Sequence, residues 1–422
     1  MSPPGRPRTP DSASAPSGPS AAPDTTARHV RFGWLDLAGP SDDRDGVVVD
    51  GSGLALGTPA GRRDYHDPFG DSGPRGYDYG LWVSPPQSST FPVTSIVVSW
   101  AAETPGTSWV GVGVRGRPDD DTPWSRWFVV TRWAATDDEI HPTTVPGQTA
   151  DGATVEADEL NIEPDRGWTS YQVRAILFRL AGTADRSRLT RLGIMTSAVR
   201  RGTDSELPPT SRPTLPEPVT LEVPTYSQQL HRDSFPRYDG GGQSWCSPTS
   251  VAMVLSYFDA LPPPHDYAWV EPQSADRFVP YLARRCFDHA YGGAGNWAFN
   301  TAFAATRDLE AFVTRLRCLA EAEEFIAAGI PLVTSLAFDD GELDGAGYDT
   351  KGHLMVLVGF TETGDVVVND PASHRTESND DVRTVYRRDQ VEALWLRSSG
   401  GVVYVIHPSY LPLPPAPSEP NW

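Results

Sequence analysis

A Pro-rich stretch at residues 203–219 divides the chain into two parts with different hydrophobic periodicity. Before it, apolar and polar residues alternate as they do in half-buried strands; after it, helical periodicity comes first and apolar strand runs follow. Proline fixes φ and lacks an N–H, so this stretch favours a semi-rigid extended linker. A chain of 422 residues can bury two cores. The sequence therefore predicts domains at 28–202 and 221–408, joined by a linker at 203–220.

The first part predicts a mainly β fold. Its alternating runs are bounded by Pro, Gly and Asp clusters, and they occupy residues 95–100, 109–116, 124–133, 171–180 and 191–198. Short strands joined by polar turns, without helical periodicity, are typical of an antiparallel sandwich. We expect a sandwich with a jelly-roll-like arrangement.

Tryptophans are concentrated in this β-rich part, as Trp100, Trp109, Trp124, Trp127, Trp133 and Trp168. Flat aromatic faces stack on sugar rings, so one interpretation is a module that binds carbohydrate or peptide. The other is that the tryptophans fill the sandwich core and its rim. The second is favoured because most of them fall inside strand runs.

The second part predicts an α+β domain. A strand-like segment at 221–228 is followed by helical segments at 247–258, 274–288, 297–307 and 317–328. The remaining apolar runs predict strands at 330–338, 353–360, 365–370, 383–388 and 401–408. Helices first and antiparallel strands afterwards is the α+β pattern. It also suits a papain-like arrangement, with a nucleophile on a helix and its base on the sheet.

Cys246 precedes the first of these helices. Val251, Val254, Leu255 and Phe258 form its apolar stripe, so the cysteine lies at the helix N-terminus. Free N–H groups and aligned peptide dipoles at that end stabilise a thiolate. A buried structural thiol fits the same position, so this cysteine alone leaves both interpretations open.

His353 and Asp370 lie on consecutive predicted strands. His353 opens the first strand and Asp370 closes the second, with a turn predicted at Thr363 and Gly364. In a hairpin these two positions meet at the open end, which brings an imidazole and a carboxylate together. Taken singly, each residue is also explained as a structural strand-end or turn residue. Together with Cys246 they fit a nucleophile, a base and a group that orients the base.

Three segments carry a resemblance to a known family: VPTYSQ, SWCSPTSVAMVL, and GHLMVLVGF followed by GDVVVNDP. Residues 221–407 resemble the papain-like peptidases that process double-glycine leaders and their stand-alone relatives. The resemblance implies a thiolate–imidazolium pair of Cys246 and His353, with Asp370 orienting the imidazole. The exporter and membrane segments of the leader-processing enzymes are absent, so leader processing is not implied.

The resemblance also implies a glutamine in the oxyanion hole. Gln228 matches the family's position after a VPxxxQ strand, although an insertion separates it from the cysteine. Gln243 is nearer in sequence but lies in the Gly-rich loop, and is the reserve candidate. With these residues the expected chemistry is acyl transfer through an acyl-enzyme.

Composition excludes several function classes. With 55 acidic and 35 basic residues the net charge is −20, which disfavours nucleic acid and anionic membranes as partners. No segment approaches the ~20 apolar residues of a membrane helix. Residues 1–27 predict a disordered tail without the apolar core of a signal peptide. A cytoplasmic location is therefore the default, and secretion applies if the true start lies upstream. The Pro-rich tail at 409–422 is expected to lie over the surface or to be loose.

Metal, cofactor and disulfide chemistry have weaker signals. Cys286 and His289 form a Cys-x-x-His without a second ligand pair, and the acidic loop 338–349 lacks EF-hand spacing. We expect no cofactor and no metal, and we interpret the loop as a flexible segment beside His353. Cys286 and Cys318 are either two free thiols, the favoured interpretation, or a pair.

The sequence thus predicts a thiol-dependent hydrolase, a cysteine peptidase or amidase that acts on a peptide or protein. Two alternatives remain open. A transamidase uses the same three residues to pass the acyl group to an amine, and a non-catalytic protein uses the same groove to bind a peptide or glycan.

Overall fold

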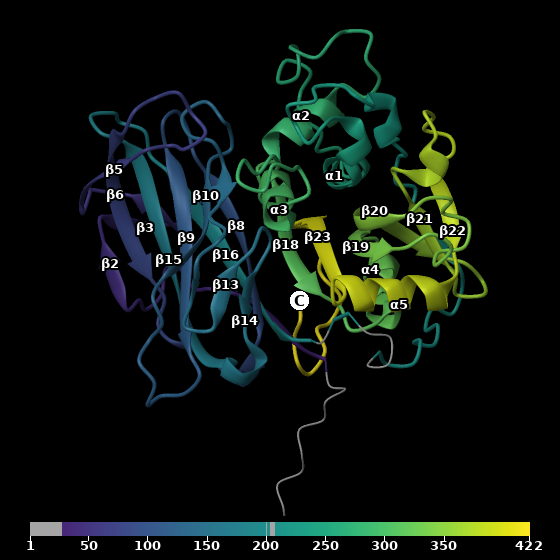
Figure 1. Ribbon diagram of the computed structural model, residues 1–422, viewed down its shortest axis with the longest axis horizontal. Coiled ribbons are helices and arrows are strands. Elements are labelled where there is room, and N and C mark those ends of the chain that lie inside the picture. The colour runs from purple at the N-terminus through teal and green to yellow at the C-terminus, as the bar shows by residue number, and fades with distance from the viewer. Residues whose placement is uncertain (1–27, 200, 203–206) are drawn as a thin grey trace, which may run out of the picture.

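The structure, a computed structural model, describes residues 28–199, 201–202 and 207–422. The predicted disordered tail at 1–27 and residues 203–206 of the predicted linker lie outside the described residues. Two units lie side by side in Figure 1, a β sandwich built by the N-terminal half and a mixed unit of helices and one sheet.

The N-terminal half folds into two eight-stranded sheets whose strand pairs are all antiparallel. The first sheet contains, in spatial order, β12 (Thr149–Ala150), β13 (Ala153–Val155), β14 (Leu160–Ile162), β8 (Ser95–Glu103), β16 (Arg188–Ala198), β4 (Gly53–Leu56) and β3 (Val47–Asp50), with β1 (His29–Trp34) on β16. The second contains β11 (Thr143–Thr144), β10 (Phe128–Trp133), β9 (Trp109–Arg117), β15 (Trp168–Leu180), β6 (Arg75–Val83) and β2 (Asp43–Asp45), with β5 (Gly61–Tyr65) on β6 and β7 (Gln87–Val93) on β15. A short 3-10 turn, η1 (Pro164–Arg166), precedes β15.

The core of the sandwich explains the alternating sequence pattern. Val110, Val112 and Val114 of β9 are buried between the sheets, while the residues between them face outward. Four of the tryptophans are at most 2 % exposed, namely Trp100, Trp109, Trp133 and Trp168. The predicted mainly β fold is confirmed. Trp100, Trp133 and Trp168 belong to the core between the sheets, whereas Trp109 stacks on Phe178 outside it, and Trp124 and Trp127 are half-exposed.

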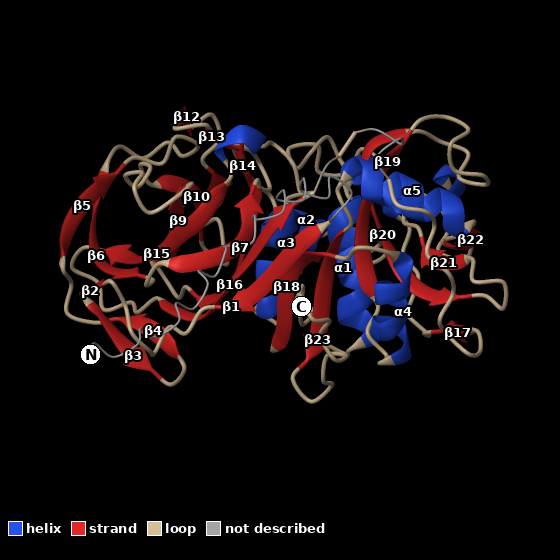
Figure 2. Ribbon diagram, turned by 90° about the horizontal axis from the view of Figure 1, so that it is seen from below, coloured by secondary structure: helices blue, strands red, loops and turns tan. Residues whose placement is uncertain are grey.

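The C-terminal half contains one seven-stranded antiparallel sheet with helices around it. In spatial order its strands are β18 (Leu309–Arg315), β23 (Val402–Pro408), β19 (Leu332–Phe338), β20 (Thr350–Phe360), β21 (Val366–Asn369) and β22 (Arg383–Tyr386), with β17 (Val219–Thr220) on β20. The helices are α1 (Cys246–Tyr257), α2 (Phe278–Arg285), α3 (Trp297–Ala305), α4 (Leu319–Ala327) and α5 (Arg388–Ser398), with 3-10 turns η3 (Gln228–His231), η4 (Gly242–Ser244) and η5 (Ser373–Arg375). Figure 2 shows the long helices confined to this half.

Three local predictions for this half were wrong. The segment 221–228 is not a strand, because Pro224 interrupts it and side chains satisfy its backbone: the Val223 carbonyl accepts hydrogen bonds from Asn369 and Arg383. Strand β18 was not predicted between two helices. Helix α5 was taken as part of a β region, although its buried residues Val391, Leu394 and Trp395 show the i, i+3, i+4 spacing of a helix.

The two halves share their cores. Helix α3 packs against β8 of the sandwich and β18 of the third sheet (Figure 1). Its residues Ala298, Phe299 and Ala302 belong to the sandwich core, and Phe32 of β1 stacks on Phe312 of β18 with ring centroids 4.3 Å apart. The seam between the halves is therefore packed like a protein interior.

A buried ion pair crosses the same seam. The Arg315 guanidinium is fully buried and donates to Glu159 at 2.8 Å and to the Ser197 hydroxyl at 2.8 Å. Arg201 donates to the other Glu159 oxygen at 2.6 Å. Because Glu159 precedes β14 and Arg315 ends β18, these hydrogen bonds fix the sandwich on the third sheet.

The last residues also pack near this seam, which agrees with the first of the two expectations for the tail, that it lies over the surface or is loose. Trp422 is 9 % exposed and its ring lies edge-on to Phe325, with centroids 5.0 Å apart. The Asn421 amide donates to the Arg315 carbonyl at 2.8 Å. No helix within the described ranges has the length and apolar character that crossing a membrane requires.

Candidate active site

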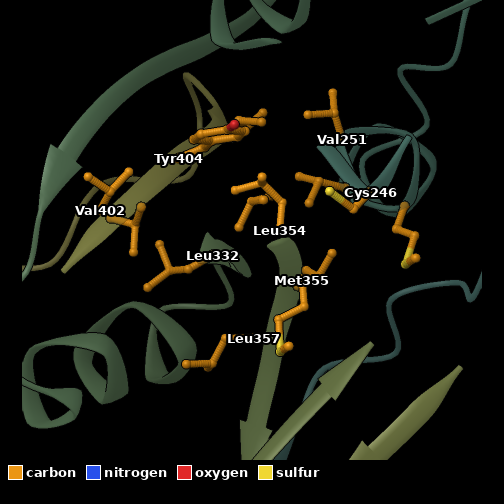
Figure 3. Packing of buried hydrophobic residues seen from close by; sticks show 14 of the residues in the cluster. Cys246, Val251, Leu332, Leu354, Met355, Leu357, Val402 and Tyr404 are labelled. Atoms are coloured by element: carbon orange, nitrogen blue, oxygen red, sulfur yellow. The ribbon is translucent and has the colours of Figure 1, made fainter. Parts of the chain in front are cut away.

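Cys246 is the first residue of α1, as its position before an apolar helical stripe predicts. The start of the helix is fixed by Trp245, whose fully buried indole donates to the Tyr238 carbonyl at 2.7 Å. Cys246 is 8 % exposed and belongs to the same buried cluster as Val251 and Leu354 (Figure 3). Its sulfur is therefore at the edge of the core, at the positive end of a helix dipole.

The glycines before Cys246 allow a tight approach of the chain. Gly240 and Gly241 have φ values of 75° and 118°, which side chains other than glycine rarely adopt. A Cβ at Gly242 would lie 2.4 Å from the Gln228 carbonyl oxygen. The Gly-rich loop is thus packed directly on η3, and this contact holds Gln228 near the start of α1.

His353 and Asp370 lie together as the hairpin argument predicts. Strands β20 and β21 pair in antiparallel register, and the Gly364 N–H closes their turn on the Thr361 carbonyl at 2.9 Å. His353 Nε2 lies 2.8 Å from Asp370 Oδ1, and both side chains are at most 4 % exposed. This contact leaves Nδ1 as the ring nitrogen for proton exchange with a nucleophile.

Two tyrosines that the sequence interpretation missed complete the surroundings of Asp370. The hydroxyl groups of Tyr348 and Tyr386 donate to Oδ2 at 2.7 and 2.8 Å. The Ala372 N–H donates to Oδ1 at 2.9 Å. Every oxygen of this fully buried carboxylate therefore accepts hydrogen bonds, which fixes its orientation and that of His353.

The electrostatics favour a charged pair. Burial of His353 would lower its pKa, but the charge and hydrogen bond of Asp370, with a smaller effect of nearby Cys246, raise the pKa to about 10. For Asp370, burial raises the pKa, yet His353, Tyr348 and the Ala372 N–H hold it below its ordinary value. His353 is thus held as an imidazolium at neutral pH, with Asp370 and Cys246 as its partners.

The two candidate glutamines differ in what their amides bind. Gln228 is 2 % exposed; its Nε2 donates one N–H to the Gln243 carbonyl at 2.7 Å and has a second N–H. The Gln243 side chain is exposed and engaged within its own loop, with Asp233 and the Gly240 carbonyl. The Gln228 amide therefore has an N–H that can donate to a substrate oxygen, whereas the Gln243 side chain is used in hydrogen bonds within its own loop.

A cleft of about 650 Å³ contains these groups. Cys246, His353 and Gln228 line it, and the N-terminal half contributes Asp158 and Arg201 to the same wall. Burial raises the pKa of Asp158 to about 8, although the Trp297 N–H at 2.7 Å opposes the shift. The sandwich therefore forms part of the cleft rather than standing apart from it.

The remaining sequence candidates have other surroundings. The loop 338–349 brings Tyr348 to Asp370, and Asp349 from the same loop lines the cleft. All three cysteines are free, with Cys286 fully buried. His289 contacts the Pro142 carbonyl at 3.0 Å. Within the described part of the chain, no group of three His, Cys, Asp or Glu residues could hold a metal ion.

Comparisons with known proteins add to this geometry. Residues 220–403 match the family described as Peptidase C39-like, and residues 40–197 match the family described as the Peptidase C39 N-terminal domain. No curated protein matches the chain. Among solved structures, one described as a C39-like peptidase from Bacillus anthracis matches with 18 % identity and a TM-score of 0.30, covering 45 % of this chain and 97 % of that one.

Proposed function

We propose that this chain, whose residues 220–403 match the Peptidase C39-like family and whose residues 40–197 match the Peptidase C39 N-terminal domain, is a thiol-dependent peptidase or amidase acting through Cys246, His353 and Asp370. One observation carries the proposal: a buried His353–Asp370 pair that lines the same cleft as the cysteine at the start of α1. A histidine with a purely structural role would need a hydrogen-bond partner such as Asp370. It would not also need a cysteine at a helix N-terminus, or a cleft that is lined by both the histidine and the cysteine.

The proposed mechanism uses groups of this chain alone. The Cys246 thiolate attacks the substrate carbonyl, and the oxyanion accepts hydrogen bonds from the Cys246 N–H and Gln228 Nε2. His353 gives its proton to the leaving amine, which leaves an acyl-enzyme. His353 then takes a proton from water as the water attacks the thioester; the acid is released, and the Cys246 thiolate and His353 imidazolium are restored. Asp370 stays ionised and orients the imidazole throughout.

The N-terminal sandwich has a positioning role in this proposal. Asp158 and Arg201 lie on the cleft wall, so a peptide in the cleft contacts both halves. The jelly-roll connectivity of the sandwich and the exact domain limits stay predictions. Transfer to an amine remains the alternative to hydrolysis, and product analysis with added amine separates the two.

The two glutamines provide a test of the oxyanion assignment. We expect Gln228→Ala to lower kcat by about 10²- to 10³-fold with little change in KM, because the donor acts on the transition state. We expect Gln243→Ala to stay within about tenfold of wild type, because its amide is engaged with Asp233 and Gly240. Kinetics with a fluorogenic peptide selected from a library give both numbers. Equal losses in the two variants would reject Gln228 as the donor.

The raised pKa of His353 predicts a pH dependence of stability. The imidazole titrates near 6.5 when unfolded and near 10 when folded, so the folded state holds more protons between these values. Its stabilisation is complete below pH 6.5 and is lost as the pH rises to 10, by up to about 1.4 kcal/mol per pH unit for one proton. We expect urea unfolding to show this alkaline loss in wild type and a flatter profile in His353→Gln. Parallel profiles would contradict the charged pair.

A further inference from the structure

The outward face of the second sheet carries a small cavity far from Cys246. On β9 the outward positions include Gly111 and Gly113, and β15 places Ile176 and Arg174 opposite them. A Cβ at Gly113 would lie 2.9 Å from Arg174 Nε, so the glycine makes room for that side chain. The cavity is about 170 Å³, and its walls include Arg63, Tyr65, Trp109, Arg132, Arg174 and Phe178.

Four arginines on this face are held by aromatic rings rather than by carboxylates. Arg174 and Arg115 lie 4.8 and 4.6 Å from the centre of the Trp127 ring. The Cζ atom of Arg63 lies 4.4 Å from the centre of the Tyr79 ring, and that of Arg132 lies 5.1 Å from the centre of the Tyr65 ring. A guanidinium stacked in this way keeps its N–H edge for a ligand. Arg115 is the exception, because its Nε and Nη2 donate to Gln172 Oε1 at 3.0 and 2.6 Å.

These arginines have no counter-ion within the described ranges: none of Arg63, Arg115, Arg132 and Arg174 forms an ion pair. Asp64 lines the cavity too, but it is exposed and pairs with none of them. Burial, together with the charges of Arg63 and Arg115, lowers the pKa of Arg174 to about 10. In a chain of net charge −20, a concentration of unpaired cations is an exception that needs an explanation.

We infer that this face is a binding site for an acidic saccharide, a sugar ring that carries a carboxylate. Guanidinium groups bind carboxylates through paired N–H donors, and aromatic and apolar walls suit the flat face of a sugar ring. Peptide- and drug-sized ligands occupy about 300–1,000 Å³, so a cavity of 170 Å³ suits a single ring.

Two other classes of macromolecule fit less well. An extended peptide binds at the free edge of a sheet through main-chain hydrogen bonds, whereas Trp109, Arg174 and Phe178 of this cavity lie on the face of β9 and β15, both paired on two sides. Nucleic acid is repelled by the strongly acidic remainder of the chain.

The saccharide site is separate from the proposed catalysis. The first sheet lies between the second sheet and the helical half, and β5 and β6 are at the far side of the molecule from α1 (Figure 1). A ligand held there would anchor the chain to an acidic polymer without entering the cleft. Binding can therefore be tested in a protein whose Cys246 is intact or replaced.

The test uses the full chain and a defined oligomer of galacturonic acid, with calorimetry and tryptophan fluorescence as readouts. We expect binding that weakens as salt rises, and a loss of about tenfold or more in Arg63→Gln and in Arg174→Gln. Arg62→Gln is the matched control, because Arg62 is the neighbour of Arg63 on β5 and is already paired with Asp78 at 3.0 Å. It should bind within about twofold of wild type.

Arg63 is exposed, so Arg63→Gln keeps the test interpretable even if Arg174→Gln folds poorly. Four results would overturn the inference: no binding of the oligomer at millimolar concentration, equal binding of its methyl ester, equal or tighter binding of polyglutamate or single-stranded DNA, or the same loss in Arg62→Gln. Binding of the acid but not the ester, lost in Arg63→Gln and kept in Arg62→Gln, would support it.

Discussion

Replacing Cys246 with alanine is expected to reduce peptide or amide hydrolysis by at least about 10⁴-fold while leaving the fold intact. The side chain is small and lies at the edge of the core, so its removal costs little packing. The sulfur, however, supplies the nucleophile, and no other described thiol lines the cleft. Turnover of a library-selected fluorogenic peptide and a thermal melt on the same sample measure both quantities.

Cys318→Ala is the matched control, because Cys318 is half-buried at the start of α4 and away from the cleft. It should keep wild-type turnover. Alkylation with iodoacetamide at neutral pH gives an independent measurement: Cys246 should react first, and this reactivity should disappear in His353→Ala. Wild-type turnover in Cys246→Ala, or equally slow alkylation of all three thiols, would remove the basis of the enzymatic proposal.

The second large effect concerns the seam between the two halves. Glu159→Gln is expected to lower the free energy of unfolding by about 3–5 kcal/mol, because it leaves the fully buried Arg315 without a counter-charge. Urea unfolding monitored by tryptophan fluorescence measures the change. Glutamine has nearly the same shape as glutamate, so the substitution opens no cavity. The loss of stability therefore measures the charge and its hydrogen bonds.

A second ion pair across the same seam is the matched control. Glu310 accepts two hydrogen bonds from Arg191, at 2.7 and 2.8 Å, but the Arg191 side chain is 42 % exposed. Water screens such a pair, so Glu310→Gln should cost only about 0–1 kcal/mol. Similar losses in the two variants would show that burial does not decide the strength of these pairs.

The buried pair also has a pH signature. Burial raises the pKa of Glu159, but Arg315 and Arg201 outweigh this and lower it to about 2, below its ordinary value of 4.5. Its stabilisation is complete above pH 4.5 and is lost as the pH falls towards 2. The stability difference between wild type and Glu159→Gln should therefore shrink on acidification through this window.

The sequence could locate the three central residues because each depends on local structure. The helix that begins at Cys246 is encoded by its own apolar stripe, and the turn at Thr361 to Gly364 joins the strands that carry His353 and Asp370. Periodicity and turn residues act within a few positions of the chain. Their predicted proximity needed no knowledge of the rest of the fold, whereas their catalytic roles stay a proposal.

What the sequence interpretation missed depends on contacts between distant segments. Tyr348 and Tyr386 reach Asp370 from a loop and from β22, and no local pattern marks them as its partners. Arg315 is fully buried, although arginine is among the residues most often exposed. The unpaired arginines around Gly113 were also invisible, because only the alternation of β9 together with β15 brings them to one face.

The shared cores at the seam have a consequence for how such a chain can change over generations. Helix α3 supplies Phe299 to the sandwich core, while Phe32 of the sandwich lies in the core of the other half. The two halves match two different sequence families, yet neither half has a polar, self-contained surface where it meets the other. A recombination event that exchanged one half for a relative's would create mismatched packing unless the opposing residues came with it. The two halves are consequently constrained to be inherited and to diverge together.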